Sequence, residues 1–267
     1  MDLTGTTCLV TGAGRGIGLG IARALAERPV DLLLIGMRDP SGGPPLHPGD
    51  PGVRAREIRA VRMDLGSQEA IDACCDALAA ELGALDLLVN NAGQVTGGLL
   101  EEQDLGEIYA MFQANLVGLV HLTHRVLPAM LARGHGKVVN NASISGYAAV
   151  PAASTYAASK HGVVGFSESL RRELVGTGVS VMHLVTPGVA TDMLATTDDL
   201  YGRHMDTSDW PRQTPEAWGA KVVEAIERDA VRLMPRDRSR ILVALSRGPA
   251  KLVDAVAARM FTRSPGA

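Results

Sequence analysis

This chain has few cysteines, and it has no block of basic residues. Three cysteines occur among its 267 residues, namely Cys8, Cys74 and Cys75. An odd number without regular spacing does not indicate a disulfide framework, and it fits a reducing, cytoplasmic compartment. Cysteines and histidines do not cluster at the spacing of zinc ligands. The formal net charge is −3 and no long basic run is present, so we do not expect nucleic acid as a partner.

The sequence also lacks an apolar stretch that is long enough to span a bilayer. Its first residues lead almost directly into a strand-like run at 6–10, without the basic and apolar regions of a signal peptide. Hydrophobic residues make up 46% and charged residues 21% of the chain. This balance suits an α/β domain with a large core, and we therefore predict a single domain over residues 1–267.

Short apolar runs alternate with longer helical stretches along the chain. Strands are predicted at residues 6–11, 31–36, 58–63, 85–90, 137–141, 179–186 and 231–234. Helices are predicted at residues 16–28, 67–82, 105–133, 155–176 and 215–228, followed by two shorter ones at 239–247 and 249–261. The alternation predicts a doubly wound parallel sheet of about seven strands with helices on both faces.

Three segments depart from this alternation. Residues 39–57 are rich in proline and glycine and predict a surface insert. We interpret residues 187–215 as a substrate loop, since a connection of this length in a compact domain is often a functional lid. Residues 239–261 predict two amphipathic helices, divided at Gly248-Pro249 because proline cannot continue a helix. These helices could cap the substrate cleft, pack on a second subunit or rest on a membrane surface, and packing is the interpretation that we favour.

A tyrosine and a lysine lie one turn apart in the helix predicted over residues 155–176. Tyr156 and Lys160 therefore share a helix face, and Ser143 precedes Tyr156 by 13 residues. An ammonium beside a phenol favours the phenolate, which would let the tyrosine act as an acid or base near neutral pH. The serine hydroxyl could hold the substrate oxygen that gains or loses the proton.

Glycines recur in the turn between the first predicted strand and the first predicted helix. The segment reads Thr-Gly-Ala-Gly-Arg-Gly-Ile-Gly over residues 11–18. Glycines let a backbone turn tightly and approach a pyrophosphate at the positive end of the helix. The placement predicts dinucleotide binding by Gly12, Gly14, Arg15, Gly16, Ile17 and Gly18.

The end of the second predicted strand indicates which dinucleotide binds. An acidic residue at that position would bind the ribose diol of NAD(H) and repel a phosphate. Here Arg38 follows the strand, and Arg15 of the glycine turn could reach the same pocket. Two guanidinium groups suit a 2′-phosphate dianion, so we favour NADP(H) over NAD(H). Asp39 leaves an alternative open, because it could pair with Arg38 or bind a ribose itself.

With these parts in order, the chain resembles the short-chain dehydrogenase/reductase family, over about residues 4–235. The glycine turn, the Ser143, Tyr156 and Lys160 trio and Asn115, at the position of the family's helix-bending asparagine, all match its pattern. The resemblance implies a Rossmann-like fold with Asn115, Ser143, Tyr156 and Lys160 as catalytic residues. It also implies that further residues bind the cofactor, namely Asp64, Leu65, Asn91, Ala92, Gly93, Tyr156, Lys160, Pro187, Gly188, Val189 and Thr191, besides Arg38 and the turn.

The resemblance further implies hydride transfer that interconverts a small-molecule carbonyl and a secondary alcohol. Tyr156 would handle the proton, Ser143 would orient the substrate oxygen, Lys160 would hold the nicotinamide ribose and favour the tyrosinate, and Asn115 would keep a water in line with Lys160. With NADP(H), reduction of a ketone or aldehyde is the expected direction. The family also suggests a homodimer or homotetramer formed through the long helices around Asn115 and Tyr156.

The sequence departs from the family pattern at two points. Thr191 follows Pro187 by four positions instead of five, and the usual Ile-Ser-Ser is replaced by Asn141-Ala142-Ser143. Ser145 is a nearby hydroxyl, but its spacing to Tyr156 favours Ser143. Two alternative functions stay open: a non-catalytic NADP(H)-binding redox sensor, which would be expected to lose the tyrosine or lysine, and an epimerase or dehydratase with a different glycine spacing.

Overall fold

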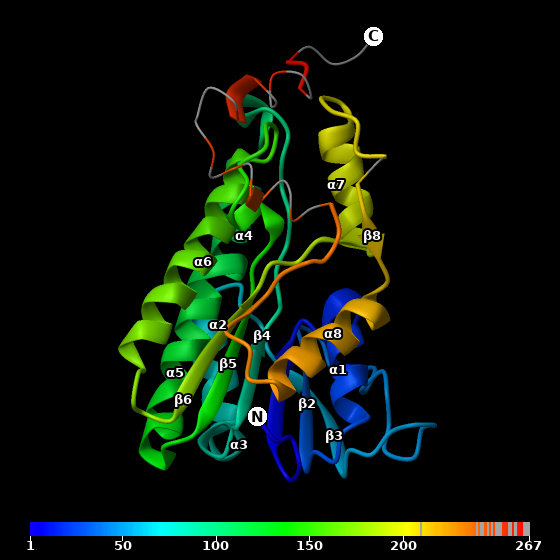
Figure 1. Cartoon of the computed structure of the whole chain (residues 1–267). Coiled ribbons are helices and arrows are strands. Elements are labelled where there is room, and N and C mark those ends of the chain that lie inside the picture. Colours follow the sequence, from blue (N-terminus) through cyan, green and yellow to red (C-terminus); the bar gives the residue numbers. More distant parts are fainter. Residues whose placement is uncertain are drawn as a thin grey trace.

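Seven parallel strands form the central sheet of the computed structural model (Figure 1). The structure describes residues 1–208, 210–238, 240, 243, 244, 246, 248, 253–255, 258 and 261–263. In spatial order the strands of the described sheet are β3 (Glu57–Arg62), β2 (Leu32–Met37), β1 (Thr7–Thr11), β4 (Leu87–Asn90), β5 (Gly136–Asn141), β6 (Val179–Leu184) and β9 (Arg232–Leu233). The prediction of a doubly wound parallel sheet is confirmed.

The strand order reverses at β1. Val10 of β1 pairs with Ile35 of β2 on one side and with Val89 of β4 on the other. In open α/β sheets, such a reversal leaves a crevice outside the carboxyl ends of the strands, and ligands bind there. The carboxyl edge near β1 and β4 is therefore where a site is expected.

Two layers of helices cover the sheet. Helices α1 (Gly16–Ala26) and α8 (Pro215–Glu227) lie on one face, while α2 (Gln68–Ala77), α3 (Ala79–Gly83), α5 (Gly118–Arg133) and α6 (Ser154–Glu173) lie on the other (Figure 1). Cys8 and Val10 face the first layer and Leu9 faces the second. Because strand side chains alternate between faces, an almost wholly apolar β1 contributes to both cores at once.

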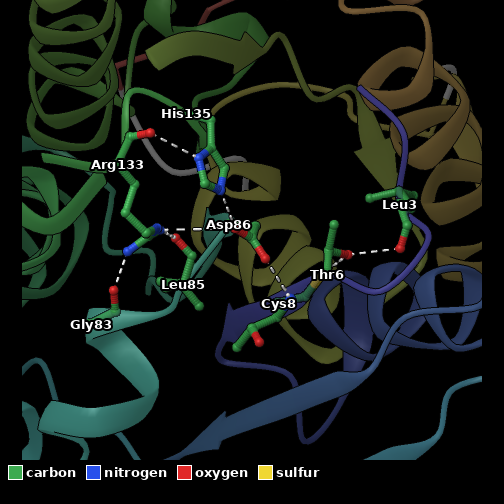
Figure 2. Close-up of polar contacts among 9 residues, drawn as sticks. Leu3, Thr6, Cys8, Gly83, Leu85, Asp86, Arg133 and His135 are labelled. Carbon is green, nitrogen blue, oxygen red and sulfur yellow. Dashed lines mark hydrogen bonds and ion pairs between the residues drawn. The ribbon is translucent and has the colours of Figure 1, made fainter. Parts of the chain in front are cut away.

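The amino ends of the strands carry a polar cluster at the edge opposite the crevice (Figure 2). Asp86 precedes β4 and its Oδ2 accepts a hydrogen bond of 2.9 Å from the Thr7 main-chain nitrogen, while its Oδ1 lies 3.0 Å from His135 Nε2. Arg133 donates to the carbonyl oxygens of Gly83 and Leu85. These contacts join β1, β4 and the connection into β5, so the cluster is structural.

The helices differ from the predictions at two places. The helix predicted over residues 67–82 is divided at Leu78, whose φ of −114° and ψ of 22° are not helical. The helix predicted over residues 105–133 consists of α4 (Leu105–Phe112), a π-helical turn over Gln113–Val117 and α5. Its apolar periodicity continues through the turn, which is why the pattern alone predicts one helix.

The predicted loop over residues 187–215 is partly regular, so that prediction is wrong in its local structure. It holds α7 (Asp192–Gly202) and two short paired strands, β7 (Gly188–Val189) and β8 (Arg212–Gln213). Helix α7 stands above the carboxyl ends of the central strands, at the top of Figure 1. The insert at residues 39–57 has no regular element before β3, yet Leu46 is buried in the core.

The helices predicted at residues 239–247 and 249–261 lie largely outside the described residues. Within the part of the chain that the structure describes, no helix is long and apolar enough to cross a membrane. The same described residues contain no group of three or more histidine, cysteine, aspartate or glutamate side chains that could hold a metal ion.

Candidate active site

The structure brings Ser143, Tyr156 and Lys160 together at the carboxyl edge of the sheet. Tyr156 and Lys160 lie in the first two turns of α6, and Lys160 Nζ is 5.8 Å from the centre of the Tyr156 ring. Ser143 follows β5 in extended backbone, and it lies close enough to the Tyr156 phenol to lower the pKa of that phenol. Ser143 Oγ also accepts a hydrogen bond of 3.1 Å from the Ser145 main-chain nitrogen.

Burial dominates the acid–base properties of this trio. It raises the pKa of the Tyr156 phenol to about 12, and the hydrogen bond to Ser143 lowers that pKa to a smaller extent. Burial also lowers the pKa of the Lys160 ammonium to about 8. With a pKa of about 12, Tyr156 keeps its proton at neutral pH.

Asn115 is fully buried in the π-helical turn between α4 and α5. Its Oδ1 accepts from the Gln94 main-chain nitrogen at 2.8 Å, and its Nδ2 donates to the Gln94 carbonyl at 2.9 Å and to Ser159 Oγ at 3.2 Å. π-Helical turns are frequent at functional sites. Here the turn lets a single amide join the loop after β4 to the helix that carries Tyr156.

Gly93 lies between Asn115 and Lys160. A Cβ atom on Gly93 would lie 2.8 Å from Asn115 Oδ1 and 3.8 Å from Lys160 Nζ. The first distance is too short for a real contact, so only glycine leaves Asn115 where it is. This requirement places Gly93 inside the candidate site.

The glycine turn before α1 has the geometry of an anion-binding loop. Gly12 has a φ of +63°, and a Cβ there would lie 2.8 Å from Ala92 Cα. A Cβ on Gly18 would lie 2.3 Å from the Gly12 carbonyl oxygen. No side chain caps the first turn of α1, so its amide groups remain available to a phosphate. The turn therefore fits the pyrophosphate of a dinucleotide.

A chain of amides and hydroxyls crosses the strand ends beneath this turn. Asn91 Nδ2 donates to the Thr11 carbonyl at 3.0 Å, and Thr11 Oγ1 accepts from the main-chain nitrogens of Asn91 and Ala92. Asn141 Nδ2 donates to Asn91 Oδ1 at 2.9 Å, and Thr186 Oγ1 donates to Asn141 Oδ1 at 2.5 Å. The network ties the glycine turn to the strand that leads into Ser143.

Sequence reasoning did not assign roles to Asn141 or Thr186. Asn141 contributes twice, because its main-chain carbonyl also accepts a hydrogen bond of 2.9 Å from Lys160 Nζ. The available signal was the departure from Ile-Ser-Ser, which puts an amide where the family has an apolar side chain. Thr186 and its side-chain partner Asn141 are 45 residues apart in the sequence, so no local pattern marks it.

The two arginines predicted to select the cofactor have different surroundings. Arg38 is exposed directly after β2. Arg15 Nη1 lies 3.0 Å from Asp192 Oδ2, and both side chains are exposed. Asp39 Oδ1 accepts a hydrogen bond of 2.9 Å from the Ser41 main-chain nitrogen. Arg38 thus stands at the carboxyl end of β2, while Arg15 bridges the glycine turn to α7.

The remaining predicted cofactor residues lie around the same crevice. Asp64 Oδ1 accepts from the Gly66 nitrogen at 3.0 Å, and the neighbouring Leu65 is buried. Pro187 precedes β7, which contains Gly188 and Val189. The Thr191 hydroxyl caps α7 by accepting from the Leu194 nitrogen at 3.3 Å, and it lies 3.2 Å from the Val189 carbonyl oxygen. Thr191 thus also fixes the start of α7, which follows it directly.

A doubly wound parallel sheet with this glycine turn and this tyrosine–lysine pair at its switch point defines an NAD(P)-dependent oxidoreductase. Comparison with known proteins agrees. Residues 6–201 match the family described as short chain dehydrogenase. The chain belongs to this short-chain dehydrogenase/reductase family.

Three similar proteins show how much of this chain and of their own length the similarity covers. The ketoacyl reductase HetN of Nostoc sp. is 37% identical over 73% of this chain and 67% of its own length. The 3-oxoacyl-(acyl-carrier-protein) reductase FabG of Vibrio cholerae is 35% identical over 74% of this chain and 80% of its own length. The structure of a metagenomic short-chain oxidoreductase in complex with NADP is 28% identical, covers 88% of this chain and 98% of its own, and has a TM-score of 0.65.

Proposed function

We propose that this chain uses NADPH to reduce a ketone to a secondary alcohol, with Asn115, Ser143, Tyr156 and Lys160 as its catalytic residues. The observation that carries the proposal is the position of Lys160, whose Nζ lies 5.8 Å from the centre of the Tyr156 ring, with Ser143 close enough to lower the pKa of the Tyr156 phenol. A phenol with a pKa of about 12 is protonated at neutral pH. That is the form in which it can donate a proton to a carbonyl oxygen, so reduction is the favoured direction.

Each residue of the site has a distinct task. When bound, NADPH supplies the hydride for the carbonyl carbon. Tyr156 donates its proton to the carbonyl oxygen, and the Ser143 hydroxyl donates a hydrogen bond that holds this oxygen. The Lys160 ammonium offsets the negative charge that develops on the phenol oxygen. Asn115 keeps the Gln94 main chain fixed and, as the family resemblance implies, places a water that returns a proton through Lys160.

The preference for NADPH rests on Arg38. Its exposed guanidinium follows β2, where an acidic residue would reject a 2′-phosphate. Arg15 lies in the glycine turn and exchanges its contact with Asp192 for the phosphate. The metagenomic relative in complex with NADP supports the same choice. The cofactor residues predicted from the sequence, from Gly12 to Thr191, surround this crevice and are proposed to bind NADPH.

Two relatives suggest which ketones to assay first. Both are named as reductases of ketoacyl or 3-oxoacyl compounds, so a ketone with a neighbouring acyl group is the first candidate substrate. A homodimer or homotetramer is proposed because Leu105, Tyr109 and Val117 expose 69%, 75% and 50% of their surfaces on the long helical segment α4–α5. The three buried free cysteines support a cytoplasmic location.

The decisive variant is Tyr156→Phe. It removes the proton donor and keeps the ring, so turnover should fall by about two to four orders of magnitude while NADPH binding survives. Turnover is read from NADPH absorbance with a panel of ketones, and binding from NADPH fluorescence. Undiminished turnover in the variant would contradict the assignment of Tyr156. NADPH binding by the wild-type chain without turnover of any ketone would instead favour a redox sensor.

A further inference from the structure

Tyr201 is a buried tyrosine whose hydroxyl has no hydrogen-bond partner among the residues that the structure describes. It lies near the end of α7 and exposes 2% of its surface. Its Oη atom is buried, and none of the described residues hydrogen-bonds it. Buried phenol hydroxyls usually have a partner. An unpaired one is costly, and such groups at a site are commonly kept for a ligand.

The surroundings of Tyr201 are two loops that lead directly to the catalytic residues. The ring packs so closely on Gly97 that a Cβ there would lie 2.2 Å from Tyr201 Cε1. It also packs with Ala152 and Ala153, which immediately precede α6, and its ring centre is 6.4 Å from that of Trp210. Gly97 follows Gly93 by four residues and Ala153 precedes Tyr156 by three. Tyr201 therefore packs on the two loops that lead to Gly93 and to Tyr156.

The two loops under Tyr201 are fixed in a costly conformation. Ala152 has a φ of +62°, which is unusual for a residue with a side chain. Its carbonyl oxygen accepts a hydrogen bond of 2.8 Å from the Gly98 nitrogen, which joins the loop before α6 to the loop after β4. Strain that a fold maintains beside a site is a reason to look for function there.

The charge state of Tyr156 affects the pKa of the Tyr201 phenol. Burial raises its pKa above the ordinary value, and the charge of an ionised Tyr156 would raise it further. Tyr201 thus stays neutral and can donate a hydrogen bond. The hydrophobic residues that pack with it include Met205, Val95 and Val150.

We propose that Tyr201 is a specificity-determining residue, whose hydroxyl donates a hydrogen bond to a second oxygen of the substrate, close to the reacting carbonyl. This proposal rests on the proposed ketone reduction. A ketone with a neighbouring ester or thioester carbonyl satisfies the hydroxyl, whereas a simple ketone buries it unpaired. Sites built to hydrogen-bond a substrate group discriminate strongly against analogues that lack the group.

The test compares ethyl acetoacetate with 2-heptanone, which has the same chain length but no ester carbonyl. Tyr201→Phe should lower kcat/KM for ethyl acetoacetate by about tenfold, mainly through KM, and leave 2-heptanone within about twofold. Thr4→Val is the control, because it removes the hydroxyl of an exposed residue just before β1, at the amino ends of the strands. It should change kcat/KM for neither substrate. Thermal melting of Tyr201→Phe should not fall, since the lost hydroxyl has no partner in the described structure.

Equal losses on both ketones, or no loss on either, would overturn the proposal. Binding is measured separately by quenching of tryptophan fluorescence, because Trp210 adjoins Tyr201. With NADP⁺ present, Tyr201→Phe should bind ethyl acetoacetate about tenfold more weakly than the wild-type chain. If the wild-type chain binds this ester more tightly than the variant but does not reduce it, the proposed reduction is wrong and the role of Tyr201 stands. If both bind it equally, the role of Tyr201 is wrong.

Discussion

Lys160 Nζ donates a hydrogen bond of 2.9 Å to the main-chain carbonyl of Asn141. The contact fixes the ammonium between the end of β5 and α6, so a single residue links the strand that leads to Ser143 with the helix that carries Tyr156. The side chain of the same asparagine continues the polar network to Asn91. The position of Lys160 is therefore set by the fold, and burial lowers its pKa to about 8.

The pH dependence of reduction should report the protonation of Lys160. Below about pH 8 the ammonium is charged, and as pH rises through this value it loses its proton and no longer stabilises charge on the phenol. We expect kcat/KM to decline above about pH 8, measured between about pH 6 and pH 10. The pKa of Tyr156, about 12, lies outside this range.

A second buried lysine provides the control for this profile. Lys137 exposes 2% of its side chain and lies 2.6 Å from Asp229, and it starts from the amino end of β5. Lys137→Met should leave the midpoint of the decline unchanged. A wild-type profile that stays level up to about pH 10 would show that Lys160 does not act as a charged group.

Replacing Arg38 should change the choice of cofactor. Arg38→Asp places an acid after β2, where it attracts a ribose diol and repels a phosphate. Since a hydrogen bond to a charged group contributes about 1.5–3 kcal/mol, kcat/KM for NADPH should fall about tenfold to a hundredfold relative to NADH. Arg56→Asp is the control. It makes the same change at an exposed residue just before β3, at the amino ends of the strands, whereas Arg38 follows the carboxyl end of β2. A preference that is the same in both variants would mean that the phosphate pocket lies elsewhere.

Gly93→Ala should impair catalysis without unfolding the chain. The added methyl group would collide with Asn115 Oδ1 at 2.8 Å and displace the amide that holds Gln94. A misplacement of this size can lower kcat about a hundredfold. Gly42→Ala is the control, because a Cβ there meets nothing within 4 Å. Circular dichroism checks the fold, and normal turnover in Gly93→Ala would show that the position of Asn115 does not matter.

The parts of this protein that the sequence predicts are those encoded locally. Strand β1 is predicted because its apolar run is uninterrupted. The glycine turn is predicted because a positive φ and close packing both require glycine at Gly12. Helix α7 is missed because its sequence is rich in threonine and aspartate, which favour helix formation weakly. Its stability comes from the Thr191 cap and from burial of Tyr201, and burial is a tertiary property.

In the site, too, local sequence predicts some features, and the tertiary structure determines others. Tyr156 and Lys160 are found from one helical spacing. The pKa of Tyr156 cannot be found in this way, because the sequence shows the neighbouring ammonium but not the burial that raises the pKa of the phenol. The partners of Asn141 come from β4 and from the end of β6, so their contact depends on the strand order. Sequence motifs thus identify the reacting groups, and the fold decides their properties.

His183 should make the chain less stable in mild acid. It is 5% exposed in β6, and its Nε2 lies 2.7 Å from the Tyr147 hydroxyl. Burial lowers its pKa to about 4; Glu168 opposes this shift, while Arg232 and Arg171 add to it. Between about pH 6.5 and pH 4 the unfolded chain binds a proton that the folded chain does not, so stability falls as pH falls through this window.

Chemical denaturation at about pH 7 and pH 5 measures this effect. The His183 contribution to the free energy of unfolding should be about 2 kcal/mol smaller at the lower pH. His183→Gln removes the titrating group. Between the two pH values, the free energy of unfolding of this variant should therefore fall by about 2 kcal/mol less than that of the wild-type chain. His47→Gln removes an exposed histidine from the insert at residues 39–57 and should retain the wild-type loss. If His183→Gln lost as much stability as the wild-type chain, the folded protein would have to accept a proton on His183 despite its burial.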